Sequence, residues 1–86
     1  MKAMEIAEAI RGFVIENFLF GSDQGLSEEA SFLQNGVVDS TGVMELVAHV
    51  EERYGITVED EELVPENFDS ISRLTAYIAR KTGVRS

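Results

Sequence analysis

The spacing of apolar residues is the feature that most constrains the fold of this 86-residue chain. In three segments, 3–20, 40–54 and 71–81, apolar side chains recur every three or four positions, which places them on one side of an α-helix. Each helix would be amphipathic and bury its stripe in a shared core. The stripes are Ile6, Ile10, Phe13, Val14 and Phe18; then Val43, Val47, Val50 and Tyr54, flanked by Leu46; and then Ile71, Leu74 and Ile78.

Residues that start or stop helices flank these segments. A glycine follows each helix, as is typical of the position after a helix C-terminus. Asp69 or Ser70 is expected to cap the last helix, and Pro65 can open a very short helix over residues 65–68. The three glycines are Gly21, Gly55 and Gly83.

The connections complete the predicted fold. The long polar stretch 21–39 contains five apolar residues that should hold it on the core, and residues 27–30 could form a single helical turn. Residues 56–58 should be an extended link and residues 59–63 one acidic turn. We therefore expect an all-α fold, a small four-helix bundle of three long helices and one short one with a long loop between the first two. One domain should span residues 1–86. The apolar residues of the long loop are Leu26, Phe32, Leu33, Val37 and Val38.

Composition excludes several classes of protein. The chain has no cysteine, so it can form neither a disulfide framework nor a thiolate metal site. No apolar run approaches the length of a membrane span, and the N-terminus lacks a basic region followed by an apolar core. We expect a monomeric cytoplasmic protein with no bound metal.

The net charge of −9 is unevenly distributed. Residues 36–69 contain many acids and a single base, Arg53, whereas residues 70–86 are basic. Such a surface repels nucleic acid and anionic lipid and attracts basic partners; a purely solubilising surface is the alternative. The acids are Asp39, Glu45, Glu51, Glu52, Glu59, Asp60, Glu61, Glu62, Glu66 and Asp69.

The segment 32–41 leads into the second helix and presents one hydroxyl, Ser40, at its start. A helix N-terminus offers unpaired N–H groups and the positive end of the macrodipole, which favour a phosphate. One hypothesis is that Ser40 carries a phosphate-linked group; the alternative is that it is an ordinary N-cap. The only histidine, His49, lies nine residues further, about half a turn around the helix from Ser40. Ser40 therefore has no local base, and His49 is expected to be solvent-exposed.

One face of the same helix suits contact with a partner. Met44, Ala48 and Glu51 lie just beside the direction of Ser40, with Glu45 and Glu52 further round. An exposed methionine among acids is an adaptable contact, although Met44 could instead edge the core. Thr41 completes the candidate partner-binding set.

These motifs resemble the acyl carrier proteins, a phosphopantetheine-dependent family, over most of the chain. The resemblance implies a four-helix bundle in which Ser40, preceded by Asp39, is modified with 4′-phosphopantetheine. The matching segments are Phe32-Leu33, Gly36-Val37-Val38-Asp39-Ser40, Glu45-Leu46-Val47, Val50-Glu51-Glu52, Tyr54-Gly55-Ile56 and Pro65-Glu66-Asn67-Phe68-Asp69-Ser70-Ile71.

The resemblance also implies partners and a function. A phosphopantetheinyl transferase would modify Ser40. A loading ligase or acyltransferase and synthases with basic patches would use the carrier in fatty-acid, polyketide or related specialised biosynthesis. Because the chain has no cysteine, the thiol that holds the cargo must come from the prosthetic group. The family usually has leucine after the serine. Here Thr41 and Gly42 follow, which favours a stand-alone carrier of a specialised acyl or aminoacyl group.

Three other functions are alternatives to a carrier. An unmodified acidic helical interaction module would explain the fold but not an exposed Ser40. A calcium site would need oxygen ligands alternating around a loop glycine, and the acidic run 59–62 offers none. An enzyme would need a nucleophile, a base and an orienting group. Four aliphatic residues could line a cleft for an acyl chain or simply form the core: Val43, Val47, Leu63 and Ile71.

Overall fold

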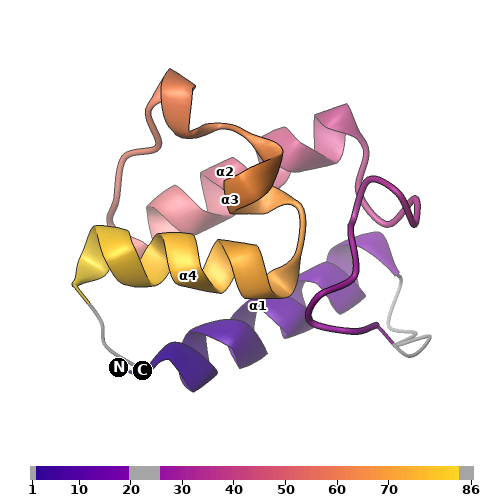
Figure 1. Cartoon of the computed structure of the whole chain (residues 1–86), viewed down its shortest axis with the longest axis horizontal. Helices are drawn as coiled ribbons and strands as arrows, with labels where there is room; N and C mark the ends of the chain where they lie inside the picture. The colour runs from indigo at the N-terminus through magenta and orange to yellow at the C-terminus, as the bar shows by residue number, and fades with distance from the viewer. Residues whose placement is uncertain (1, 20–25, 84–86) are drawn as a thin grey trace.

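The computed structural model describes residues 2–19 and 26–83, and these form an all-helical fold (Figure 1). The elements are α1 (Ala3–Phe18), α2 (Ser40–Tyr54), a 3-10 turn η1 (Asp60–Glu62), α3 (Pro65–Phe68) and α4 (Ile71–Thr82). The predicted fold of three long helices, one short helix and a long first loop is confirmed. No helix in the described part of the chain is long and apolar enough to cross a membrane.

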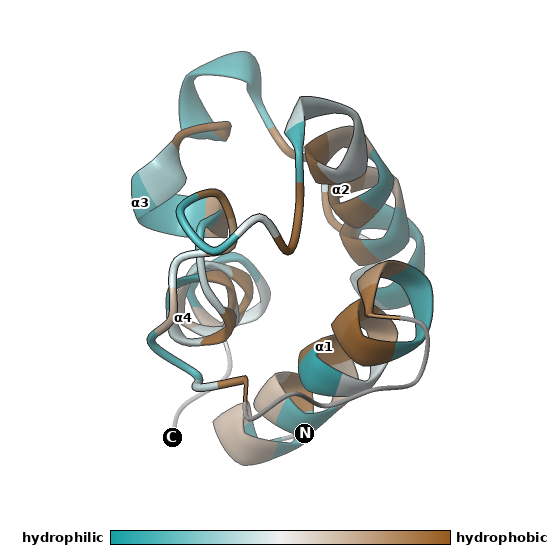
Figure 2. Ribbon diagram, turned by 90° about the vertical axis from the view of Figure 1, so that its right-hand side faces the viewer, coloured by the Kyte–Doolittle hydropathy of each residue, from teal (hydrophilic) through white to brown (hydrophobic). Residues whose placement is uncertain are grey.

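The helices enclose one core. In Figure 1, α1 runs from left to right, and α2 and α4 run back in the opposite direction. The closest packing is between α1 and α4, and α3 packs across α4. Figure 2 shows the hydrophobic side of α2 turned toward the interior and its hydrophilic side turned outward. The core residues are Ile6, Ile10, Val14, Phe32, Val38, Leu46, Val47, Val50, Phe68, Ile71, Leu74, Tyr77 and Ile78.

The composition of the α2 and α4 stripes differs in part from the prediction. Leu46, expected at the flank of α2, is fully buried, whereas Val43 and Tyr54 are only partly buried. Tyr77, which the spacing of α4 did not include, is 1% exposed. Helical spacing gives the direction of a stripe, but the neighbouring elements decide where its centre lies.

The predicted helix ends are largely confirmed. Gly55 ends α2 in the left-handed conformation, with φ of 65°, which glycine adopts without steric cost. Ser70, not Asp69, caps α4, because its hydroxyl accepts a hydrogen bond from the Arg73 amide at 3.1 Å. Helix α1 ends at Phe18, before the predicted end near Phe20. Phe20 and the predicted stop at Gly21 lie outside the described residues.

The connection before α2 is held on the core as expected. Phe32 and Val38 are 1% and 2% exposed, and Leu26 and Val37 pack against the core. Leu33 is the exception, because it is 48% exposed. Residues 27–30 form a hydrogen-bonded turn, in which the Ala30 amide donates to the Ser27 carbonyl at 3.2 Å, and not a turn of α-helix.

Candidate functional site

The first turn of α2 leaves the Ser40 hydroxyl available. Asp39 is the N-cap, and its carboxylate accepts a hydrogen bond from the Gly42 amide at 2.7 Å. Ser40 is the first residue of the helix and is exposed. The idea that Ser40 is itself the N-cap is therefore wrong. Within the described residues, its hydroxyl makes no hydrogen bond that would have to be broken for it to react.

The backbone around Ser40 favours an attached anion. The helix that begins there has 15 residues, so its aligned peptide dipoles place partial positive charge on the first turn. Asp39 satisfies one amide of that turn, and the other N–H groups at the helix start remain without intrahelical partners. A phosphodiester on Ser40 would lie next to these donors.

A glycine turn delivers the chain to Ser40. Gly36 has φ of 67°, in the left-handed region that favours glycine. The turn folds back on Phe32, whose carbonyl accepts from the amides of Val37 at 2.9 Å and Val38 at 3.3 Å. Val38 is thereby buried, and the next residues begin α2 at the surface.

Gly42 allows the end of α1 to approach the start of α2. The residue is buried, and a Cβ atom there would lie 2.8 Å from Cε1 of Phe18 and 2.9 Å from Cγ1 of Val38. Real Cβ atoms do not approach so closely, so a side chain at this position would force Phe18 and Val38 to move. The close approach accounts for the glycine that follows Thr41 in the sequence.

Asp69 ties the same connection to the start of α4. Its carboxylate accepts from the Leu33 amide at 3.0 Å and from the Ser31 hydroxyl, and its carbonyl accepts from the Phe32 amide at 2.7 Å. The Ser31 hydroxyl also accepts from the Gln34 amide at 3.1 Å. From the sequence, Asp69 is one of the acids of residues 36–69 and a possible cap of the last helix, and nothing in the local sequence indicates a contact 36 residues away.

An apolar cavity of about 300 Å³ adjoins Ser40. Val43 and Leu63 line it, as predicted for a cleft, whereas Val47 and Ile71 are core residues that do not. Nearly all of its lining is hydrocarbon, so it suits an aliphatic group better than a charged one. The lining residues are Phe32, Leu33, Ser40, Val43, Met44, Leu63, Val64, Pro65, Phe68 and Asp69.

The candidate partner-binding residues on α2 are mostly exposed. Met44 is 56% exposed and also lines the cavity, so it does not merely edge the core. Glu51 differs, because it is half-buried and its carboxylate accepts a hydrogen bond from the Val58 amide at 2.9 Å. Glu51 thus holds the link after α2. The exposed members are Thr41, Met44, Glu45, Ala48 and Glu52.

The expectation that His49 is solvent-exposed is wrong. Its ring is half-buried and stacks on Phe13, with ring centroids 3.9 Å apart and an interplanar angle of 15°. Burial lowers the pKa of His49, and the positive charge of Arg53 lowers it further. The ring joins α1 to α2, a contact between distant segments that spacing along one helix could not show.

Comparison with known proteins identifies the family. The model of the family described as "Phosphopantetheine attachment site" matches residues 19–78, well over half of the chain. The chain belongs to the acyl carrier protein family. It is a carrier protein whose prosthetic group is 4′-phosphopantetheine.

Several carriers are similar over nearly their whole length. An acyl carrier protein of Akkermansia muciniphila is 31% identical over 83 residues, which are 96% of this chain and 100% of that one. A D-alanyl carrier protein of Streptococcus suis is 30% identical over 87% of this chain and 92% of its own. A solved structure described as "Crystal structure of FAD-dependent dehydrogenase" contains a similar chain, with a TM-score of 0.72 and 29% identity. That match covers 80% of this chain and 97% of the other.

The residues at the start of α2 fit the prosthetic group of the family. Ser40 supplies an exposed hydroxyl oxygen that does not cap the helix, because the Asp39 carboxylate caps the first turn. The cavity beside Ser40 supplies apolar surface within the same region. Attachment at this position would displace no buried side chain.

Proposed function

We propose that Ser40 is the attachment residue and that the modified chain carries acyl or aminoacyl groups between enzymes. The observation that carries the proposal is the exposed Ser40 hydroxyl at the first position of α2, where Asp39 already performs the capping. An unmodified interaction module, the alternative function, would not need an exposed Ser40 hydroxyl at this position. We further propose that residues 1–86 form one domain and that the protein is a monomer in the cytoplasm.

Ser40 is a substrate of modification and not a catalytic nucleophile. In the attachment step its oxygen forms a bond to the phosphorus of coenzyme A that carries the pantetheine arm, while the bond to the departing 3′,5′-bisphosphate nucleotide breaks. The transferase supplies Mg²⁺ and the base that removes the proton, because His49 lies about half a turn around α2 from Ser40 and packs on Phe13 of α1. Asp39 keeps the first turn in place throughout. The bound group supplies a thiol that holds cargo as a thioester, and the carrier performs no catalysis of its own.

The partners are proposed from charge and exposure. Basic patches on a phosphopantetheinyl transferase, on a loading ligase or acyltransferase and on synthases would meet the acidic side of α2. Contact would involve Thr41, Met44, Glu45, Ala48 and Glu52, with the free oxygen of Glu51 at the edge. Such encounters are fast and weaken with salt, as a carrier that visits several enzymes requires.

Two observations bear on the cargo. The apolar cavity beside Ser40 favours an aliphatic acyl group of fatty-acid, polyketide or related lipid biosynthesis. Similarity to a D-alanyl carrier protein, together with Thr41 after the serine, supports a specialised aminoacyl cargo as the second candidate. A charged amino group would stay outside such a cavity, so the two cargoes predict different behaviour at Val43 and Met44.

Intact-protein mass spectrometry tests the attachment. Wild type, Ser40→Ala and the control Ser72→Ala, which alters another exposed serine, are incubated with coenzyme A, Mg²⁺ and a broad-specificity transferase. We expect wild type and Ser72→Ala to gain one phosphopantetheine and Ser40→Ala to gain none. Gain on Ser40→Ala would move the site elsewhere, and no gain on folded wild type with two different transferases would favour the interaction module.

A further inference from the structure

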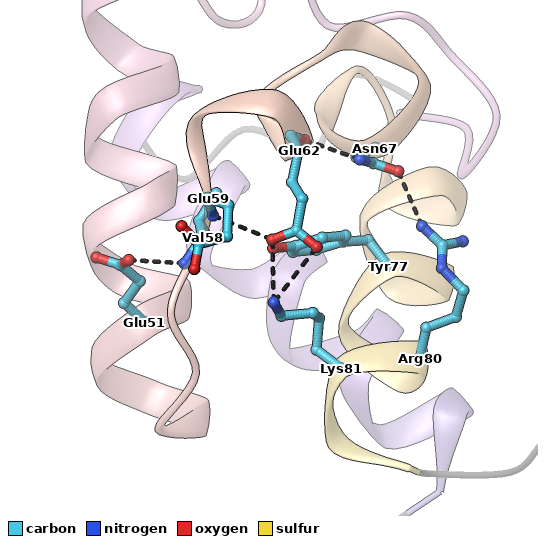
Figure 3. A network of polar contacts seen from close by, with 8 residues as sticks. All are labelled: Glu51, Val58, Glu59, Glu62, Asn67, Tyr77, Arg80 and Lys81. Carbon is cyan, nitrogen blue, oxygen red and sulfur yellow. Dashed lines mark hydrogen bonds and ion pairs between the residues drawn. The ribbon is translucent and has the colours of Figure 1, made fainter.

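A polar cluster joins η1 to α4 (Figure 3). Oε1 of Glu62 accepts from the amide of Glu59 at 3.0 Å, from Nζ of Lys81 at 3.0 Å and from the hydroxyl of Tyr77 at 3.1 Å. Its Oε2 also accepts from Lys81, at 3.3 Å. One carboxylate therefore fixes the 3-10 turn and attaches it to two residues of α4.

Asn67 extends the attachment to α3. Its side-chain amide donates to the carbonyl of Glu62 at 2.7 Å, and its oxygen accepts from Nη2 of Arg80 at 2.9 Å. Figure 3 thus shows one connected set of polar contacts from η1 through α3 to α4, made by Glu62, Asn67, Tyr77, Arg80 and Lys81, and a separate contact between Glu51 and Val58. None of these residues lines the cavity.

The segment that this cluster holds forms one wall of the cavity. Residues Leu63, Val64, Pro65, Phe68 and Asp69 lie on that wall, and Ser40, Val43 and Met44 lie on the wall formed by α2. Helix α3 packs closely on α4 but hardly on α2. Glu51 of α2 holds the link at Val58 through a 2.9 Å hydrogen bond, but beyond that link the wall is attached to α4. The contacts with α4 therefore determine how far this wall stands from α2.

We propose that Glu62, Lys81 and Tyr77 form a latch that sets the width of the cavity, and so the length of aliphatic chain that it accepts. As a statement about cargo, the inference rests on the proposed function of the carrier. As a statement about the cavity, it concerns the unmodified chain alone. Glu62 and Lys81 are specificity-determining residues in this scheme, although neither touches the cargo.

The chemistry of the cluster suits a latch that can open without unfolding the protein. The carboxylate and the ammonium group are charged partners, whose hydrogen bonds are stronger than neutral ones. Their side chains are still 28% and 27% exposed, so water can replace the bonds when they break. Tyr77 is 1% exposed and its ring remains in the core in either state. Opening would therefore loosen residues 59–67, while Phe68 stays in the core and the packing of α1 against α4 persists.

Amide hydrogen exchange on the unmodified chain tests the latch directly. The variants are Glu62→Gln, Lys81→Met and Tyr77→Phe, which removes only the hydroxyl. The control is Glu61→Gln, the same change at a neighbouring exposed acid outside the cluster. We expect at least tenfold faster exchange at the amides of Glu62, Asn67 and Phe68 in the three variants, with unchanged exchange at Leu74 of α4. Equal acceleration at all amides would show mere loss of stability, and no acceleration at all would show that no latch exists; either overturns the proposal.

Titration with straight-chain alcohols from butanol to decanol then tests the width. Binding to the unmodified chain is followed through the methyl signals of Val43 and Met44, which line the cavity. We expect affinity to stop rising at a longer alcohol in Lys81→Met and Glu62→Gln than in wild type and Glu61→Gln. The same limiting length in all four proteins would overturn the proposal. Because no step uses Ser40, failure of its modification leaves this result unaffected, and the reverse also holds.

Discussion

At the residue scale, Gly42 shows how the absence of one methyl group controls the start of α2. The residue lies where Phe18 of α1 and Val38 of the connection converge on the first turn. The sequence marked it only as a departure from the usual pattern after the serine. Its packing role depends on a residue 24 positions earlier, which no local pattern could reveal.

Substitution of Gly42 by alanine should lower stability. The added Cβ would meet Phe18 at 2.8 Å and Val38 at 2.9 Å, and such overpacking costs about 1–3 kcal/mol of unfolding free energy. The control is Gly12→Ala in α1, where a Cβ meets nothing within 4 Å and should stabilise the helix by about 0.5–1 kcal/mol. Urea unfolding measures both. Equal stability of Gly42→Ala and wild type would contradict the close approach.

His49 should make stability depend on pH. Burial lowers its pKa in the folded state, so the unfolded chain binds the proton more readily. The unfolding free energy should therefore fall as the pH drops through the ordinary histidine value of 6.5. In the His49→Gln variant, this histidine-dependent fall in unfolding free energy should be absent. Melting temperatures measured from above to below that pH, for both proteins, check the difference in slope; identical slopes would exclude the effect.

At the element scale, the helices could be predicted closely from periodicity and stop signals, while their mutual contacts could not. The spacing predicted α2 and α3 with the bounds that the structure has, because Gly55 and Pro65 act locally. Val47 and Val50 of the predicted α2 stripe are buried, but Leu46, predicted at its flank, is also fully buried, and Val43 lines the cavity. The exposure of Ser40 followed from its position at a helix start; the cap that Asp39 provides was missed.

The connection before α2 depends on Asp69 in the same non-local way. Removal of its side chain in Asp69→Ala leaves the Leu33 amide and the Ser31 hydroxyl without this acceptor and should cost about 1 kcal/mol. Asp60→Ala, the same charge change at an exposed residue of η1, serves as the control. Unfolding in urea and exchange at the Leu33 amide provide the readouts. A Leu33 amide that stays protected in Asp69→Ala would contradict this role.

At the scale of the whole molecule, the net charge of −9 produces a negative electric field around the protein, and repulsion among the acids lowers its stability. Four acids are adjacent at residues 59–62 and would repel one another, but Glu62 is paired with Lys81. Hydrogen bonds to Glu62 lower the pKa of its carboxyl group, whereas partial burial raises it. The hydrogen bond from the Glu59 amide is the largest influence, followed by that from Lys81, and the net pKa is lowered. Repulsion within this acidic run is therefore mainly among Glu59, Asp60 and Glu61.

Added salt should still raise the melting temperature. Screening weakens repulsion between exposed acids within about 10 Å at moderate ionic strength. The double variant Asp60→Asn with Glu61→Gln should melt higher than wild type at low salt and respond less to added salt. Thermal unfolding followed by circular dichroism at low and high salt measures both. A melting temperature of wild type that ignores salt would show that this repulsion is negligible.

The hydrogen bond between Tyr77 and Glu62 also has an optical consequence. The chain contains no tryptophan and two tyrosines, so tyrosine is its only strong intrinsic fluorophore. A phenol that donates to a carboxylate emits weakly, and the burial and carboxylate contact that raise the pKa of Tyr77 to about 12 keep it protonated in neutral solution. In a Tyr54→Phe background, the ultraviolet emission of the single remaining tyrosine would brighten whenever its bond to Glu62 breaks. The protein thus contains its own label-free reporter, readable in a stopped-flow instrument while cargo or partner enzymes are mixed in.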